Sequence, residues 1–91
     1  MADDLELVVA ALAGGPDAFA PIVEHYQDAV FGIAVARLGD FHEAQDVAQE
    51  VFVQAFRDLP KLRNPERLGP WLRRLTICRC VDRLRGRRKT A

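Results

Sequence analysis

The stretch from Glu43 to Leu59 has the most regular apolar spacing in the chain, and it constrains the fold more than any other segment. Its apolar residues recur at intervals of three and four, which at about 100° per residue places them on one half of a helix. They are Ala44, Val47, Ala48, Val51, Phe52, Ala55, Phe56 and Leu59. Asp40 is a suitable N-cap, with Glu43 as its capping-box partner. We predict an amphipathic helix packed on a core.

The outer half of this helix is polar and acidic. Asp46, Gln49 and Glu50 fall within one turn, with the apolar Val53 beside them and Arg57 one turn further on. An acidic helix face is usually only solvated surface. The apolar residue in the patch and the charge distribution of the whole chain favour a binding surface.

Opposite charges are segregated along the chain. Residues 1–56 have ten acidic side chains and one basic side chain, Arg37, whereas residues 57–91 have twelve basic and three acidic ones, so the halves carry −9 and +9. Solubility surfaces normally mix both signs. The segregation therefore indicates one basic and one polyanionic partner. A second interpretation is that some of these charges pair with each other inside the fold.

Three further helices are predicted, over about residues 3–13, 17–38 and 71–87, so the fold class is all-α with about four helices. In the first, Leu5, Val8, Val9 and Leu12 are expected to form the packed side. Pro21 suits only a first turn, so the regular part of the second helix should begin near Ala20. The second helix and the central one should pack as an antiparallel pair. Residues 1–86 then form one domain, and residues 87–91 a basic tail or linker.

The last helix combines apolar residues with many arginines. Trp71, Leu72, Leu75 and Cys78 should form one apolar face, and Ile77, Cys80, Val81 and Leu84 a second. Asp82 projects from the side of Trp71, and we expect it to pair with Arg37 or Arg79, because a buried unpaired charge is costly. Cys78 and Cys80 point to opposite sides of a helix and have no metal-ligand spacing.

The residues indicate binding and no catalysis. No nucleophile with a nearby base, phosphate-cradling glycine loop or metal cluster is present, so no cofactor is expected. The arginine-rich last helix, Trp71 and the basic loop over residues 61–69 together favour nucleic acid. In this loop Leu62 and Leu68 should fasten the backbone to the core. Two alternatives stay open: a helical protein-interaction adaptor, and a stand-alone DNA-binding regulator. With no signal sequence and no membrane span, we expect a cytoplasmic protein.

Four motifs together resemble region 2 of bacterial RNA polymerase sigma factors, and the match is closest to the extracytoplasmic-function group. They are D-A-F near the start of the second helix, R-L-G-D at the turn, D-V-A-Q-E-V-F-V-Q-A-F in the central helix, and W-L-x-x-L-x(6)-D-R-L-R in the last. The resemblance covers about residues 3–88 and implies a non-enzymatic transcription initiation factor.

The resemblance implies two binding surfaces. The first docks on the coiled coil of the polymerase β′ subunit through Asp46, Gln49, Glu50, Val53 and Arg57. The second recognises the −10 promoter element and helps to melt it by capturing its non-template single strand. Residues of its base pocket would be Leu62, Arg63, Asn64, Leu68 and Cys78. Backbone contacts would come from Arg73, Arg74, Arg79 and Arg83.

The resemblance also implies an anti-sigma protein that covers one or both surfaces. At two positions the chain departs from the family pattern: Cys78 replaces an asparagine common in relatives, and Leu68 replaces an aromatic residue. The chain stops at Ala91, before the region that reads the −35 element. We therefore expect an excised domain that needs polymerase or single strands to bind promoter DNA.

Overall fold

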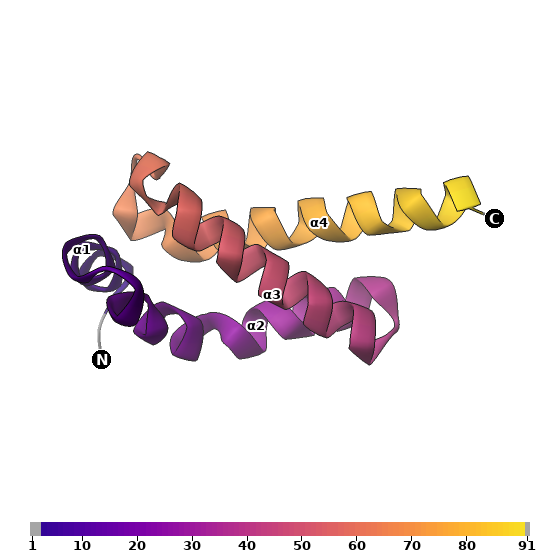
Figure 1. The fold of residues 1–91 in the computed structure, drawn as a ribbon, viewed down its shortest axis with the longest axis horizontal. Helices are drawn as coiled ribbons and strands as arrows, with labels where there is room; N and C mark the ends of the chain where they lie inside the picture. Colours follow the sequence, from indigo (N-terminus) through magenta and orange to yellow (C-terminus); the bar gives the residue numbers. More distant parts are fainter. Residues whose placement is uncertain (1–2, 91) are drawn as a thin grey trace.

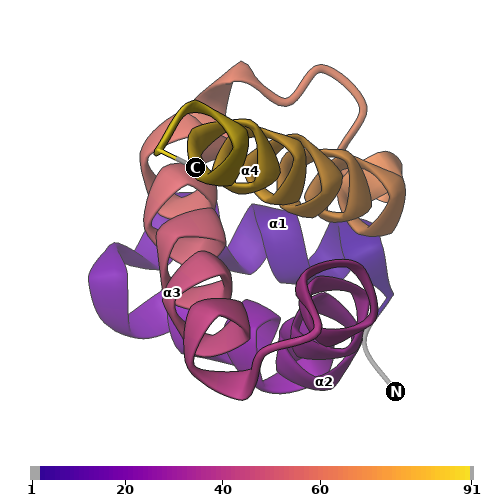
Figure 2. The same ribbon diagram turned by 90° about the vertical axis from the view of Figure 1, so that its right-hand side faces the viewer.

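The computed structural model describes residues 3–90, and in this range the chain forms four α-helices and no strand. The helices are α1 (Asp4–Gly14), α2 (Ala20–Leu38), α3 (Phe41–Asp58) and α4 (Leu68–Thr90), with short 3-10 turns at Pro16–Phe19, Leu59–Lys61 and Pro65–Arg67. Helices α2, α3 and α4 run along the long axis, and α1 crosses one end (Figure 1). An end-on view shows the three long helices around one core, with α1 behind them (Figure 2). The predicted all-α class is confirmed.

Helix α3 has the predicted N-terminal cap and the predicted buried face. The Asp40 carboxylate accepts the backbone N–H of Glu43 at 2.9 Å. The Glu43 carboxylate pairs with Arg87 of α4, so its side chain serves a tertiary contact. The turn before α3 depends on Gly39, whose φ of 70° lies in the left-handed region. The fully buried residues of α3 are Ala44, Val47, Val51 and Ala55, and Leu59, which follows the helix, is nearly fully buried.

Helix α2 begins at Ala20 and runs antiparallel to α3, as predicted (Figure 1). A 3-10 turn over Pro16–Phe19 precedes it, which leaves Pro21 in the first α-helical turn, where its missing N–H costs nothing. The residues that α2 buries are Ile22, Val30, Ala34 and Leu38. Phe56 of α3, predicted to be buried, is instead nearly half exposed, because it lies at the edge of the contact beside Phe19.

The predicted packed face of α1 is right for Val8 and wrong for the other three residues. Leu7, Val8 and Ala11 are buried, whereas Leu5, Val9 and Leu12 are exposed. Nearly every position from Leu5 to Ala13 is apolar, so periodicity alone could not select one side. Because α1 crosses the end of the bundle, only a narrow strip of it meets the other helices (Figure 2).

Helix α4 is longer than predicted at both ends. It starts at Leu68, which is fully buried, and it continues through Thr90, so residues 87–90 are helical; Ala91 lies outside the described residues. Leu72, Thr76 and Cys80 follow Leu68 at four-residue intervals as its buried stripe. Arg87 extends the contact of α4 by donating to the carbonyl of Leu38 at 3.3 Å. A domain boundary at residue 86 stays a prediction.

Two expectations for side chains of α4 need correction. Asp82 does not pair with Arg37 or Arg79: its side chain is 76% exposed and lies 3.9 Å from Arg85. It projects outward, so water solvates its charge. Cys78 is exposed and does not belong to a packed face, whereas Cys80 is fully buried. No described helix is long and apolar enough to cross a bilayer.

Asp4 joins three helices through its carboxylate. One oxygen accepts the hydroxyl of Tyr26 on α2, and the other accepts the backbone N–H of Gly69 at 2.9 Å, in the first turn of α4. The negative charge thus lies at the positive end of the α4 dipole. Burial, the hydrogen bond and the charge of Asp4 raise the pKa of Tyr26 to about 12.

We predict that Tyr26→Phe lowers the free energy of unfolding by about 1.5 kcal/mol, the scale of a hydrogen bond to a charged group. Because the pKa of Tyr26 in the folded protein lies above the ordinary tyrosine value of 10.0, this contribution is complete below pH 10 and is lost as the pH rises toward 12. Urea unfolding of both proteins across this range measures it. A difference between them that stays constant up to pH 12 would contradict the prediction.

Candidate protein and nucleic-acid interfaces

The loop before α4 and the start of α4 enclose a basic groove of about 470 Å³. Its lining residues are Lys61, Leu62, Arg63, Asn64, Arg67, Pro70, Trp71 and Arg74. Arg63, Asn64 and Arg74 are exposed, and Trp71 is half-buried against the core. The structure thus brings together three of the predicted loop residues, one predicted backbone arginine and the only tryptophan of the chain.

The charge of the basic groove is largely uncompensated. Lys61 lies 3.7 Å from Asp58, but its side chain is well exposed, so this pair is weak. Among the side chains of residues 3–87, Arg63, Arg67 and Arg74 form no ion pair. Unpaired guanidinium groups around an indole ring can bind phosphates and stack an unpaired base.

The other predicted nucleic-acid residues lie outside this groove. Leu68 is fully buried, so its side chain anchors the loop and cannot reach a bound base without leaving the core. Cys78 is exposed further along α4 and does not line the groove. Arg73 is exposed and has no ion pair within the described residues.

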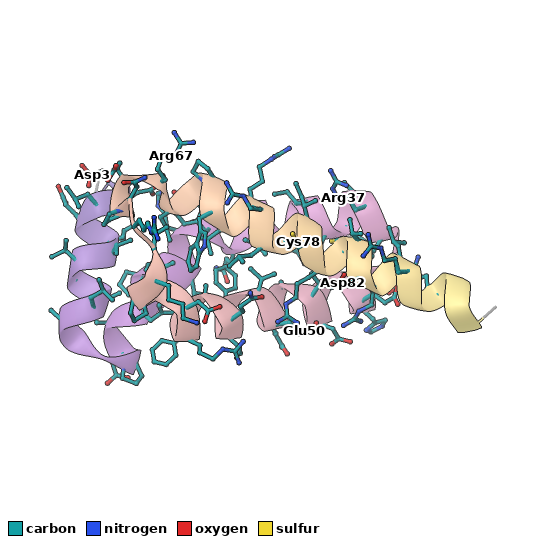
Figure 3. The ribbon with its side chains drawn as sticks, turned by 90° about the horizontal axis from the view of Figure 1, so that it is seen from above. Asp3, Arg37, Glu50, Arg67, Cys78 and Asp82 are labelled. Carbon is teal, nitrogen blue, oxygen red and sulfur yellow. The ribbon has the colours of Figure 1, made fainter. Side chains whose placement is uncertain are left out.

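Arg79 and Arg83 are bound to α3 in this structure. Arg83 donates to Glu50 at 2.6 Å and lies 3.8 Å from Asp46, while Arg79 contacts Glu50 at 3.3 Å and Gln54 at 3.0 Å. Figure 3 places Glu50 on the α3 side of α4, where these arginines reach it. Part of the segregated charge is therefore satisfied inside the fold, as the second interpretation of the charge pattern holds.

The acidic ridge, defined by Asp46, Gln49 and Glu50 on α3, is accessible to different degrees. The side chain of Asp46 is 66% exposed, whereas that of Glu50 is 38% exposed and already paired. Val53, one turn further, is 63% exposed, and Arg57 is also exposed. A basic partner would therefore find its freest carboxylate at Asp46.

An apolar groove of about 650 Å³ between α2 and α3 borders the acidic ridge. Its lining residues are Val23, Gln27, Asp28, Phe31, Gln45, Ala48, Gln49, Phe52 and Val53. A smaller hollow continues it past Val53 to Phe19 and Phe56, whose rings meet edge to face at 5.4 Å. Gln49 thus belongs to both the ridge and the groove, and Val53 lies where the two meet.

The contribution of α2 to this surface was missed by sequence reasoning. Phe31 lines the apolar groove and stacks on Phe41 with ring centroids 6.0 Å apart. The available signal was that Phe31 does not fit the apolar period of α2, which passes through Val30 and Ala34. A large aromatic off the packed face of a helix indicates a surface with another use.

One family of known proteins matches most of this chain. The family described as Sigma-70 region 2 matches residues 22–90, which include all of α3 and α4 and nearly all of α2. This chain belongs to that family. The predicted resemblance is therefore confirmed, and this sigma region 2 chain falls in a non-enzymatic family.

Named relatives of this sigma region 2 chain are sigma factors. The ECF RNA polymerase sigma factor SigW of Bacillus subtilis is 35% identical over 75 residues, which are 82% of this chain and 40% of that protein. The RNA polymerase sigma-H factor of Pseudomonas aeruginosa is 39% identical over 87 residues, or 93% of this chain and 45% of that protein. The ECF RNA polymerase sigma factor SigM of Mycobacterium tuberculosis is 28% identical over 82 residues, 90% of this chain and 42% of that protein. This chain spans less than half the length of each.

We predict that Glu50→Ala destabilises the fold by about 1 kcal/mol, because two guanidinium groups lose their shared partner at a partly solvated site. Gln49→Ala is the matched control, since Gln49 is exposed on the same helical turn. Urea unfolding of the three proteins measures the effect. Equal unfolding free energies for Glu50→Ala and Gln49→Ala would mean that the ion pairs contribute nothing.

Proposed function

We propose that this chain is the domain of an ECF sigma factor that docks on the β′ coiled coil of RNA polymerase and recognises and helps to melt the −10 promoter element. The observation that carries the proposal is the basic groove, where Arg63 and Asn64 of the loop meet Trp71 and Arg74 of α4. This combination of guanidinium groups without ion pairs, a side-chain amide and an indole ring suits a single strand whose nucleobases have left the stack.

Capture of one strand is sufficient for the domain to assist melting. A site that binds unstacked bases has no affinity for the closed duplex at those positions, so its binding free energy favours the open form. No nucleotide hydrolysis is needed. In this proposal Asn64 and Trp71 contact bases, while Arg63, Arg73 and Arg74 contact the backbone. Contacts of Arg79 and Arg83 with the backbone stay a prediction from the family resemblance. Both side chains would have to leave Glu50 before they could bind a phosphate.

The apolar groove and the acidic ridge together form the proposed polymerase contact. A basic coiled coil would place apolar side chains in the groove against Phe31 and Phe52, and cationic ones against Asp46. Val53 and Gln49 line both parts of the contact, and Arg57 borders it. An anti-sigma protein would prevent docking by covering the same groove.

One binding experiment separates this proposal from its alternatives. The chain is titrated into fluorescent single-stranded −10-like DNA, into the corresponding duplex, and into a β′ coiled-coil fragment. The proposal expects binding to the single strand and to the fragment, with weaker binding to the duplex. Tight binding to the duplex alone would favour a stand-alone DNA-binding regulator, and no nucleic-acid binding would favour a protein-interaction adaptor.

For the polymerase contact, we predict that Asp46→Arg abolishes binding to polymerase core, because it places a cation where a basic partner must approach. The side chain is exposed, so the unfolding free energy should change little. Glu6→Arg, which reverses an exposed acid on α1 outside both grooves, is the control. Pull-down with polymerase core measures the result, and retention of Asp46→Arg at the level of the control would refute the docking surface.

For the nucleic-acid contact, we predict that Arg74→Ala weakens binding to single-stranded −10-like DNA and makes its salt dependence shallower. Loss of one phosphate contact should reduce the slope of log K against log[salt] by about 0.7. Fluorescence anisotropy over a salt series measures the slope. Arg85→Ala is the comparison, since Arg85 lies two turns or more beyond the basic groove and next to Asp82. Equal slopes for both variants would remove Arg74 from the site.

A further inference from the structure

Arg37 is the only basic residue among the first 56, and it stands in the last turn of α2. Its side chain is exposed and forms no ion pair with the side chains that the structure describes, those of residues 3–87. Ten acidic residues share this half of the chain, yet none of them pairs with Arg37 in the part of the chain that the structure describes. The position of Arg37 relative to α4 indicates what its free charge could bind.

Arg37 lies on the flank of the bundle opposite the paired arginines. In Figure 3, Arg37 and Glu50 are on opposite sides of α4, and Arg67 of the basic groove is on the same side as Arg37. Its guanidinium is close enough to Cys80 of α4 to oppose the rise that burial causes in the pKa of that thiol. Arg37 is thus an electrostatic neighbour of α4 about halfway along that helix.

Arg73 lies between the basic groove and Arg37. It is six residues from Arg79, or about 120° around the helix, so it is displaced from the α3 flank that Arg79 occupies. From Arg73 to the level of Cys80 the rise along α4 is about 10 Å. Arg67, Arg73 and Arg37 therefore follow one another along this side of the molecule.

The two flanks of α4 differ in what a phosphate would meet. On the α3 flank, the charges of Arg79 and Arg83 are balanced by those of Glu50 and Asp46, so these four side chains sum to zero. On the α2 flank, Asp28 points about 180° away from Arg37, nine residues earlier on the helix, and lines the apolar groove. A polyanion leaving the basic groove therefore meets an unpaired cation on the α2 flank, whereas the cations of the α3 flank are already balanced.

We propose that Arg37 is a further nucleic-acid contact, which binds a phosphate of the strand as it leaves the basic groove past Arg73. This inference rests on the proposed capture of single-stranded DNA and adds the direction in which the strand leaves the basic groove, along the α2 flank of α4. A purely structural role for Arg37 is favourable interaction with the C-terminal end of the α2 dipole. That role predicts an effect on stability and none on DNA binding.

The test compares Arg37→Gln with Arg37→Lys by fluorescence anisotropy on single-stranded −10-like DNA over a salt series. Lysine keeps the charge and the helix-dipole interaction, and glutamine removes both. We expect Arg37→Gln to weaken binding and to reduce the salt slope by about 0.7, while Arg37→Lys keeps the slope. Urea unfolding verifies that both variants are folded under the assay conditions.

Two further proteins make the outcome decisive. Arg74→Ala reports on the basic groove, and Arg79→Ala on the α3 flank. A shallower slope for Arg37→Gln and Arg74→Ala, with little change for Arg79→Ala, supports the path along the α2 flank. A shallower slope for Arg74→Ala and Arg79→Ala but not for Arg37→Gln overturns the inference and leaves the proposed function intact. Failure of the unmodified chain to bind single strands would instead overturn the proposed function.

Discussion

The pairing of Glu50 with Arg79 and Arg83 is the contact on which the arrangement of both surfaces depends. It joins α3, from the acidic half of the chain, to α4, from the basic half, and it does so at a partly solvated position where each charge keeps some water. Halves of charge −9 and +9 would attract each other in any compact fold. Here the attraction is concentrated at the contact between α3 and α4, where Glu50 has two guanidinium partners and Glu43 pairs with Arg87. Several of the remaining charges stay open to solvent.

That concentration divides the charged residues by use. Carboxylates and guanidinium groups at the α3–α4 contact stabilise the fold, whereas Asp46 on one side and Arg63, Arg67 and Arg74 on the other stay open to solvent. The same division explains why the distribution of charge along the sequence identified the binding residues only in part. Net charge along the sequence predicts that partners of both signs exist, but it does not say which members of each set are already paired.

Much of the fold and part of the site could be predicted from the sequence. The spacing over Glu43–Leu59 predicts α3 and its cap, because a helix with one apolar side has one way to pack. The face of α1 could not be predicted, since its apolar residues surround the helix. Phe31 was missed for a related reason. A groove between two helices is a property of how they pack, so it cannot be found from the sequence of either helix alone. Arg83 shows the same limit, because its pairing depends on Glu50, which lies 33 positions away in the sequence.

Helix α1 supports the basic groove without contributing a residue to it. The family match begins at residue 22, after α1, yet Asp4 accepts the N–H of Gly69 beside the groove and holds Tyr26 with its other oxygen. Gly69 leaves room for this contact, since a Cβ there would lie 3.0 Å from the Tyr26 hydroxyl. The start of α4 fixes Pro70, Trp71 and Arg74 relative to the loop. The start of α4 is therefore held in place by a carboxylate 65 positions earlier in the chain, so the segment before the family match helps to shape the proposed binding surface.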